Sequence, residues 1–169
     1  MELKIEELRI DLPDADATDR LGQALARTRP ASAVVHLHGD LGAGKSTLAR
    51  ALLRALGVTG TIRSPTYTLI ERYPLQGGGE AWHLDLYRIA DASELDFLGL
   101  DEGAAVLWLI EWPERGHGHL PAPDLEVHLE VEGLGRRARL LVPTPVGEQW
   151  LGQVEAIARA DPSLRTISE

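Results

Sequence analysis

Apolar residues recur along the chain at two different spacings, which predicts that strands and helices alternate. Some segments place apolar side chains three and four positions apart, as on one face of a helix; these are residues 14–28, 46–57 and 145–161. Other segments are β-branched or alternate between apolar and polar residues, which is typical of strands. The predicted strands are 32–40, 66–73, 80–89, 104–112 and the two halves of 125–142.

Residues of special conformation mark the ends of these elements. Asp14 or Asp16 is suited to cap the first helix, and Gly57 is suited to end the second. The stretch "PLQGGG" connects strands 66–73 and 80–89 as a hairpin, and Gly133–Gly135 turns the late hairpin. "SELDFLGLDE" predicts a short helical piece. In the last helix the expected buried stripe is Val146, Trp150, Leu151, Val154 and Ile157.

Length and composition favour a single domain over residues 1–169. The net charge of −9 argues against direct wrapping of nucleic acid, which requires a basic face, so a role with nucleic acid would be indirect or local. The chain has no cysteine, no stretch long enough to span a bilayer, and a charged start unlike a secretory signal. We therefore expect a soluble protein of the cytoplasm that has no membrane partner.

One glycine-rich stretch, "HLHGDLGAGKSTLAR", lies between a predicted strand and a predicted helix. Its Gly39-x4-Gly44-Lys45-Ser46 spacing is that of a phosphate-binding loop, in the strand–loop–helix context that such a loop needs. Without Cβ atoms the backbone can approach a polyphosphate and direct its N–H groups inward. Lys45 would then reach the β and γ phosphates, Ser46 would ligate Mg²⁺, and Thr47 would lie near the α phosphate. The alternative is a glycine-rich turn that matches by accident.

The sequence also bears on which nucleotide base is bound, because one recognition element is missing. Guanine-specific relatives of such loops read the base with an Asn/Thr-Lys-x-Asp element, but the only lysines here are Lys4 and Lys45. ATP is therefore favoured over GTP.

A Mg²⁺ ion held by a hydroxyl also needs a carboxylate, which commonly ends a buried strand beside the loop. Glu111 and Asp85 are both candidates, and Glu111 follows the more apolar run; Asp85 could instead position the attacking water. Either acid could also simply bond backbone amides. In "RSPTYTL", Ser64 or Thr66 could bond Mg²⁺, water or phosphate, or the stretch could be an ordinary turn that opens a strand.

Other chemically active side chains give weaker indications. His36 and His38 alternate on one strand and His117 and His119 share a loop, but neither pair has a third ligand at a recognisable spacing. The sequence therefore favours no metal site at the histidines. "GRRAR" in the late hairpin supplies arginines that could be solvated or could contact a nucleotide or a partner.

Five motifs together carry a family resemblance. "GDLGAGKST", "SPTYTL", "HLDLYR", "ELDFLGLDE" and "LIEWPERG" occur in this order from about residue 36 to 116, and "ATDRLG" and "GRRARL" flank them. In these motifs the chain resembles the TsaE (YjeE) family, bacterial P-loop ATPases needed for threonylcarbamoyladenosine modification of tRNA next to the anticodon. The resemblance implies an α/β P-loop NTPase fold with a mixed, partly antiparallel central sheet flanked by helices.

The same resemblance implies roles for single residues. The nucleotide would be bound by Gly39, Gly42, Ala43, Gly44, Lys45, Ser46 and Thr47, with Thr18 and Arg136 nearby. Ser46 and Glu111 would ligate Mg²⁺, and Lys45, Glu111, Asp85 and Thr66 would contribute to hydrolysis. Ser46 departs from the threonine usual in the family, but a serine hydroxyl can ligate equally.

The implied activity is Mg²⁺-dependent hydrolysis of ATP that supports TsaB and TsaD, so that tRNA is contacted only indirectly, through the complex. No arginine is obviously placed to stabilise the transition state, which predicts slow hydrolysis by the isolated protein. Two other functions stay open from the residues alone: a nucleotide-gated adaptor that does not require hydrolysis, and a small-molecule kinase.

Overall fold

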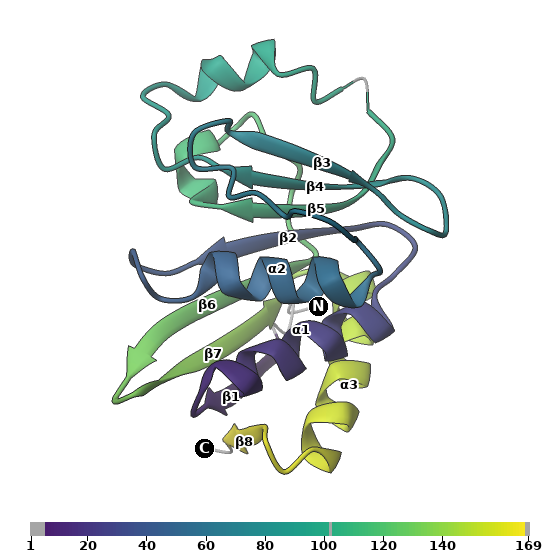
Figure 1. Ribbon diagram of the computed structural model, residues 1–169, viewed down its shortest axis with the longest axis vertical. Helices are drawn as coiled ribbons and strands as arrows, with labels where there is room; N and C mark the ends of the chain where they lie inside the picture. Colours follow the sequence, from purple (N-terminus) through teal and green to yellow (C-terminus); the bar gives the residue numbers. More distant parts are fainter. Residues whose placement is uncertain (1–5, 102, 168–169) are drawn as a thin grey trace, which may run out of the picture.

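The computed structural model describes residues 6–101 and 103–167, in which one mixed sheet is flanked by helices (Figure 1). The strands are β1 (Glu6–Leu12), β2 (Ala33–His38), β3 (Ile70–Pro74), β4 (Glu80–Asp85), β5 (Ala105–Glu111), β6 (Leu125–Glu132), β7 (Gly135–Val142) and β8 (Arg165–Ile167). The helices are α1 (Ala15–Thr28), α2 (Lys45–Ala55) and α3 (Pro145–Ala160), with 3₁₀ helices η1 (Ala92–Phe97) and η2 (Pro113–Gly116). The predicted α/β class with a partly antiparallel sheet is confirmed.

The order of the strands positions the candidate site. They follow each other as β3-β4-β5-β2-β6-β7-β1-β8, and the neighbours from β4 to β6 are parallel. The outer pairs β3–β4, β6–β7, β7–β1 and β1–β8 are antiparallel. Because parallel strands end at the same edge, the last residues of β2, β4 and β5 meet there.

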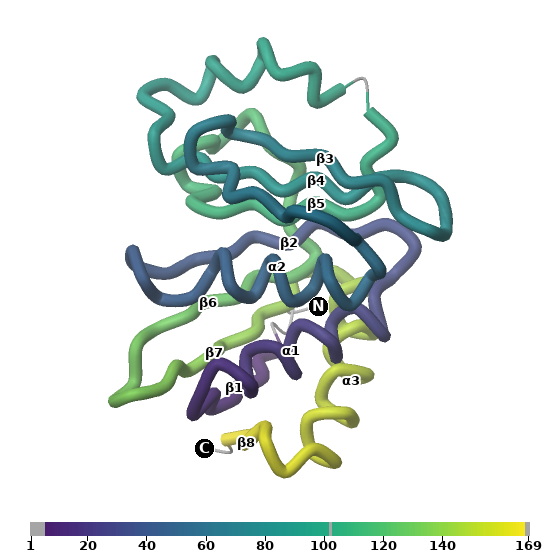
Figure 2. The backbone as a smooth tube through the Cα atoms, viewed as in Figure 1, coloured from purple at the N-terminus to yellow at the C-terminus, as the bar shows by residue number. Residues whose placement is uncertain are grey.

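The two faces of the sheet are covered differently. On one face α1 and α2 pack over a large apolar core that includes Leu21, Leu52 and Leu109 (Figure 1). On the other face a smaller core surrounds Trp82 and Ile110. Two segments cover it: the connection from β4 to β5, and the segment that follows β5. Figure 2 shows the first of these connections passing beyond β3 before the chain returns to β5. The rest of this face, on β2, β6 and β7, carries mainly polar side chains.

Local signals in the sequence account for several element ends. Asp14 caps α1 by accepting a hydrogen bond from the Ala17 amide at 2.8 Å. Gly57 follows the end of α2 with a φ of +92°, and Gly133 turns the β6–β7 hairpin with a φ of +60°. The predicted helices, both hairpins and the turn at Gly133–Gly135 are therefore confirmed, and Asp14 is the cap.

Three expectations need correction. Residues 66–69 form a turn instead of the start of β3, because the Leu69 amide donates to the Pro65 carbonyl at 2.8 Å. Strand β4 ends at Asp85 and not at residue 89, because Asp85 accepts a hydrogen bond from the Tyr87 amide. Val146 was expected on the buried stripe of α3 but lies in its first turn and is 44% exposed.

Some expectations fall outside the described residues: Lys4 and the rest of residues 1–5, and Glu102 at the end of "SELDFLGLDE". Within the described ranges, every helix is too short or too polar to cross a membrane.

Candidate nucleotide site

The loop between β2 and α2 has the backbone conformation that its glycines predicted. Gly39 has a φ of +151°, and a Cβ atom there would lie 2.6 Å from the Leu129 carbonyl oxygen of β6. Gly44 has a φ of +105° and forms the N-cap of α2. Both conformations are strained for residues with a side chain. The loop therefore presents bare backbone at the positive end of a helix dipole, a geometry suited to anions.

Lys45 lies at the first turn of α2 and is buried, at 5% exposure. Its ammonium group donates hydrogen bonds to the carbonyls of Gly39 and, at 3.0 Å, Asp40, and lies 4.6 Å from the Trp112 ring centroid. Burial lowers the pKa of this lysine, opposed by the negative charges of Glu111 and Asp85. A buried cation thus lies at the loop where phosphate oxygens would lie.

Ser46 and Glu111 contact each other directly. The Ser46 hydroxyl lies 3.0 Å from both oxygens of the Glu111 carboxylate, which ends β5 and is 2% exposed. The Nε2 atom of buried His83 lies 2.6 Å from Oε2 of the same carboxylate. Glu111 is therefore fixed from two sides. Ser46 bonds Glu111 and not Asp85, which separates the two acids that the sequence left as alternatives.

Asp85 ends β4 next to Glu111, its partner in the parallel register. It accepts hydrogen bonds from the Thr66 hydroxyl at 3.1 Å and from the Tyr87 amide at 3.0 Å. The Ser64 hydroxyl lies 2.8 Å from that of Thr66, which extends the chain of polar groups into the loop before β3. Asp85 is 5% exposed, so this carboxylate is held in one orientation beside the cavity.

These groups surround one cavity of about 260 Å³. Its lining comprises Leu41, Gly42, Gly44, Lys45, Ser46, Thr47, Thr66, Asp85, Tyr87, Glu111, Trp112 and Arg136. The Arg136 guanidinium, from β7, donates to the carbonyls of Ala43 and Gly42 at 3.1 Å each. It thereby satisfies outward-pointing carbonyls of the loop.

A second cavity of about 240 Å³ adjoins the first. The two share Gly44, Thr47 and Arg136 in their linings, and the second is completed by the α1 start, including Thr18, and by the hairpin turn. Thr18 is 5% exposed. The two cavities therefore adjoin each other around the loop and the start of α2.

The comparisons with known proteins agree with this geometry. Residues 12–139 match the family model of the threonylcarbamoyl adenosine biosynthesis protein TsaE. The Haemophilus influenzae tRNA threonylcarbamoyladenosine biosynthesis protein TsaE is 38% identical over 151 residues, covering 85% of this chain and 95% of that protein. The chain belongs to the TsaE family. The Bacillus subtilis TsaE protein is 32% identical over 160 residues, covering 93% and 98% of the two chains.

A solved structure supports the fold. The crystal structure of Bacillus subtilis YdiB superposes with a TM-score of 0.72 at 23% identity, covering 95% of this chain and 99% of that one. The P-loop NTPase fold expected from the sequence is confirmed. Membership of the TsaE family carries a role in threonylcarbamoyladenosine biosynthesis of tRNA and fits nucleotide binding.

The structure brings the predicted site residues of this TsaE family member to one place. Five of the predicted loop residues line the first cavity together with Thr66, Asp85, Glu111 and Arg136, and Thr18 lines the second; the five are Gly42, Gly44, Lys45, Ser46 and Thr47. Gly39 and Ala43 belong to the loop but do not line this cavity. His117 and His119 lie apart from the site, and His119 contacts Asp96 at 2.9 Å. For His36 and His38 the structure adds a neighbour that the sequence did not indicate, Glu126.

The sequence analysis did not identify His83 as part of the site. A signal was present, because His83 and Asp85 are two residues apart in a strand and so lie on the same face. Two polar residues on the inner face of an otherwise apolar strand indicate a shared polar environment. Tyr87 was also missed, because it follows the strand in a turn.

Proposed function

We propose that this TsaE family member binds ATP with Mg²⁺ and hydrolyses it in support of a TsaB–TsaD complex that modifies tRNA. The observation that carries the proposal is the Ser46 hydroxyl 3.0 Å from both oxygens of the buried Glu111 carboxylate, at the mouth of a phosphate-binding loop. Family membership supports the pathway, and the geometry of the loop supports the nucleotide.

The residues present fit a magnesium ion. A hydroxyl and a carboxylate are hard oxygen donors of the kind that Mg²⁺ binds while keeping several waters. Ser46 and Glu111 would hold the ion, and His83 would keep the carboxylate in position. Bound Mg²⁺ supplies positive charge to the β and γ phosphate oxygens.

The chain itself supplies phosphate binding and orientation. Lys45 would exchange its carbonyl partners for phosphate oxygens, where its charge stabilises the transition state. Its present contacts to Gly39 and Asp40 hold the ammonium group within reach of that position. The adjoining cavity beside Thr18 is suited to the nucleoside end of the ligand.

Asp85 and Thr66 are the groups proposed to orient the attacking water. Asp85 is buried with one oxygen bonded to Thr66 and the other to the Tyr87 amide, so its remaining lone pairs have a fixed direction. Such positioning of water is a common requirement of phosphate transfer.

Partner proteins would accelerate ATP hydrolysis and hold the tRNA. Arg136 lines the cavity but its guanidinium is bound to loop carbonyls, and that of Arg88 lies over the Tyr67 ring, 4.4 Å from its centroid. This supports slow hydrolysis by the isolated protein and acceleration within the complex. The charge of −9 supports an indirect contact with tRNA, held by TsaB and TsaD in the cytoplasm.

The experiment is a binding titration of ATP and ADP with and without Mg²⁺, followed by phosphate release with and without TsaB and TsaD. We expect Mg²⁺-dependent ATP binding, slow phosphate release and acceleration by the partners. Lys45→Ala should abolish productive nucleotide use, whereas Lys45→Arg tests whether charge alone suffices. Equal turnover with and without partners would contradict the proposed coupling.

A hydrolysis-deficient variant that still binds ATP separates the proposal from an adaptor function. Asp85→Asn is the variant of choice, because it leaves the phosphate loop intact. Loss of tRNA modification supports a need for hydrolysis, and full modification favours a nucleotide-gated adaptor. Transfer of phosphate to a small acceptor instead of water would favour a kinase.

A further inference from the structure

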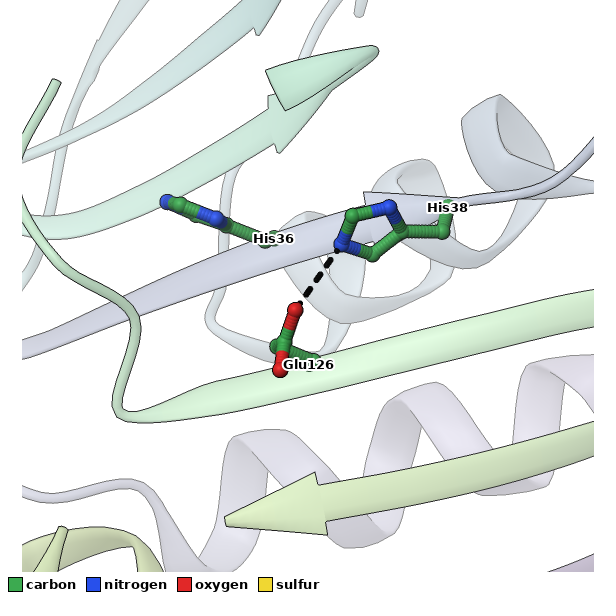
Figure 3. A group of neighbouring side chains, drawn as sticks. All are labelled: His36, His38 and Glu126. Carbon is green, nitrogen blue, oxygen red and sulfur yellow. Dashed lines mark hydrogen bonds and ion pairs between the residues drawn. The ribbon is translucent and has the colours of Figure 1, made fainter. Parts of the chain in front are cut away.

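Three potential metal ligands converge on the face of the sheet that α1 and α2 leave uncovered. His36 and His38 point out from β2, and Glu126 points toward them from the neighbouring strand β6 (Figure 3). One ligand atom from each residue lies within 4.8 Å of the other two. His38 Nε2 and Glu126 Oε1 are 3.1 Å apart. The cluster is separate from Ser46 and Glu111, which lie on the side of α2.

The sheet itself preorganises the cluster. Residues two apart on a strand share a face and lie about 6.6 Å apart along it. The parallel register places Glu126 directly beside His36. Ligands on paired strands are held more rigidly than ligands on loops. Little movement is therefore needed to bring all three around one ion.

We propose that His36, His38 and Glu126 form a binding site for a divalent transition-metal ion of the zinc class. Two imidazoles and one carboxylate are a donor set that Zn²⁺ uses together with a water molecule. Imidazole nitrogen favours Zn²⁺ and its neighbours in the first transition row over Mg²⁺, which prefers oxygen. The site therefore selects a different metal from the one proposed at the nucleotide.

Hydrogen bonds around the cluster direct the ring nitrogens. His36 Nε2 lies 3.1 Å from the Pro121 carbonyl oxygen, which can only accept, so Nε2 carries the proton and Nδ1 keeps a lone pair. In His38, Nε2 faces Glu126, and Nδ1 lies 3.8 Å from the Glu114 carboxylate. When a metal replaces the contact between His38 and Glu126, the ring proton moves to Nδ1, where Glu114 stabilises it. A carboxylate behind a ligating histidine is a common second partner in metal sites.

Packing and exposure also suit an ion. The His128 ring stacks on His38 at 4.3 Å between centroids with an interplanar angle of 3°, which restricts the rotation of the ligand. The His38 and Glu126 side chains keep 24% and 30% exposure, so an ion can enter and retain a water ligand. The ion pair of His38 with Glu126 leaves out His36, whose Nδ1 keeps a lone pair for a metal.

The test uses untagged full-length protein, freed of metal by a chelator and then titrated with Zn²⁺ against a chromophoric chelator in excess Mg²⁺. We expect one equivalent of Zn²⁺ to bind. His36→Gln and Glu126→Gln should each weaken that binding at least as much as the roughly 10–100-fold loss typical of an outer partner. Co²⁺ in place of Zn²⁺ should give the visible absorption of a four- or five-coordinate site.

Two matched variants control for other sites. His119→Gln removes an imidazole that pairs with Asp96 and is not a member of the cluster, and Glu111→Gln removes the carboxylate of the nucleotide site. Both should bind Zn²⁺ as the wild type does. The proposal is overturned if His36→Gln and Glu126→Gln bind Zn²⁺ like the wild type, or if Glu111→Gln loses the ion.

A measurement on the wild type protects the test against misfolded variants. Nitrogen-detected NMR of the histidine rings should show Zn²⁺-induced shifts at His36 and His38, with His117 and His119 unchanged. Shifts confined to other histidines would contradict the site, whatever the variants do.

Discussion

The imidazole of His83 and the carboxylate of Glu111 form a buried contact, with 2.6 Å between Nε2 and Oε2. His83 is fully buried, and its Nδ1 has no hydrogen-bond partner among the described residues. An unpaired polar atom in a core costs free energy, and the polar contact that the ring does make is the one to Glu111. We therefore expect His83 to position Glu111.

Replacing His83 should therefore disturb metal use. We expect His83→Phe to raise the Mg²⁺ concentration needed for half-maximal ATP hydrolysis by about 10–100-fold, because Glu111 loses its outer partner. ATP binding without Mg²⁺ should change little. The two titrations are compared with those of His119→Phe, and an unshifted Mg²⁺ curve for His83→Phe would count against this role.

Ser46 offers a sharper test of the metal ligands. Ser46→Ala removes the hydroxyl and should raise the Mg²⁺ concentration needed for half-maximal nucleotide binding by more than about tenfold. Ser46→Thr retains the hydroxyl and should leave that concentration unchanged. Mg²⁺ titrations of nucleotide binding by calorimetry check both. If alanine and threonine behave alike, Ser46 is not a ligand.

Asp85 should act on the chemical step. We expect Asp85→Asn to lower kcat by about 10²-fold or more, the usual contribution of a group that orients or accepts a proton, while ATP affinity stays within about threefold. Thr66→Val should reduce kcat less, because it removes one partner of Asp85 and not the carboxylate. Single-turnover phosphate release measures this, and a pure loss of affinity would refute it.

Arg136 and Arg137 are adjacent in sequence but lie on opposite faces of β7. Arg136 bonds the phosphate loop, and Arg137 pairs with Asp11 at 3.0 Å. Arg136→Ala should weaken ATP binding by about tenfold, the value of one hydrogen bond to a charged group. Arg137→Ala should leave ATP binding unchanged. Calorimetric titration with ATP measures the affinity of both variants. Equal losses of affinity would mean that ATP binding by the loop does not depend on Arg136.

Two helical glycines give opposite predictions for stability. A Cβ at Gly22 of α1 would lie 2.6 Å from the Ala51 Cβ of α2, whereas one at Gly152 of α3 meets nothing within 4 Å. We expect Gly22→Ala to lower the free energy of unfolding by about 1–3 kcal/mol through overpacking. Gly152→Ala should raise it by about 0.5–1 kcal/mol. Urea denaturation measures both changes in the free energy of unfolding. Changes of the same sign in the two variants would contradict the prediction.

The sequence correctly predicted the features that depend on residues close together in the chain. The phosphate loop, the caps at Asp14 and Gly57 and both hairpins rest on short-range signals, and the structure agrees. Strand β1 was not predicted from its alternating residues, because the strands with which it pairs, β7 and β8, lie late in the chain. For the same reason Glu126, 88 residues from His38, could not be joined to the histidines before the register of β2 and β6 was known.

Polar contacts were harder to predict than elements. Pattern alone kept both Glu111 and Asp85 as candidates, with Glu111 after the more apolar run, and the position of α2 brings Ser46 to Glu111. Residues 66–69 resemble a strand because Tyr67 and Leu69 favour one, but the bond from the Leu69 amide to the Pro65 carbonyl closes a turn there. The single-domain boundary and the catalytic roles of these residues stay predictions.

The late hairpin is physically joined to the phosphate loop. Gly39 lies against the Leu129 carbonyl of β6, and Arg136 of β7 donates hydrogen bonds to the carbonyls of Gly42 and Ala43. These contacts fix the position of the hairpin relative to the loop. Its tip carries Leu134, whose side chain is completely exposed, at 101%. The hairpin that braces the phosphate loop therefore also presents an apolar side chain at the surface.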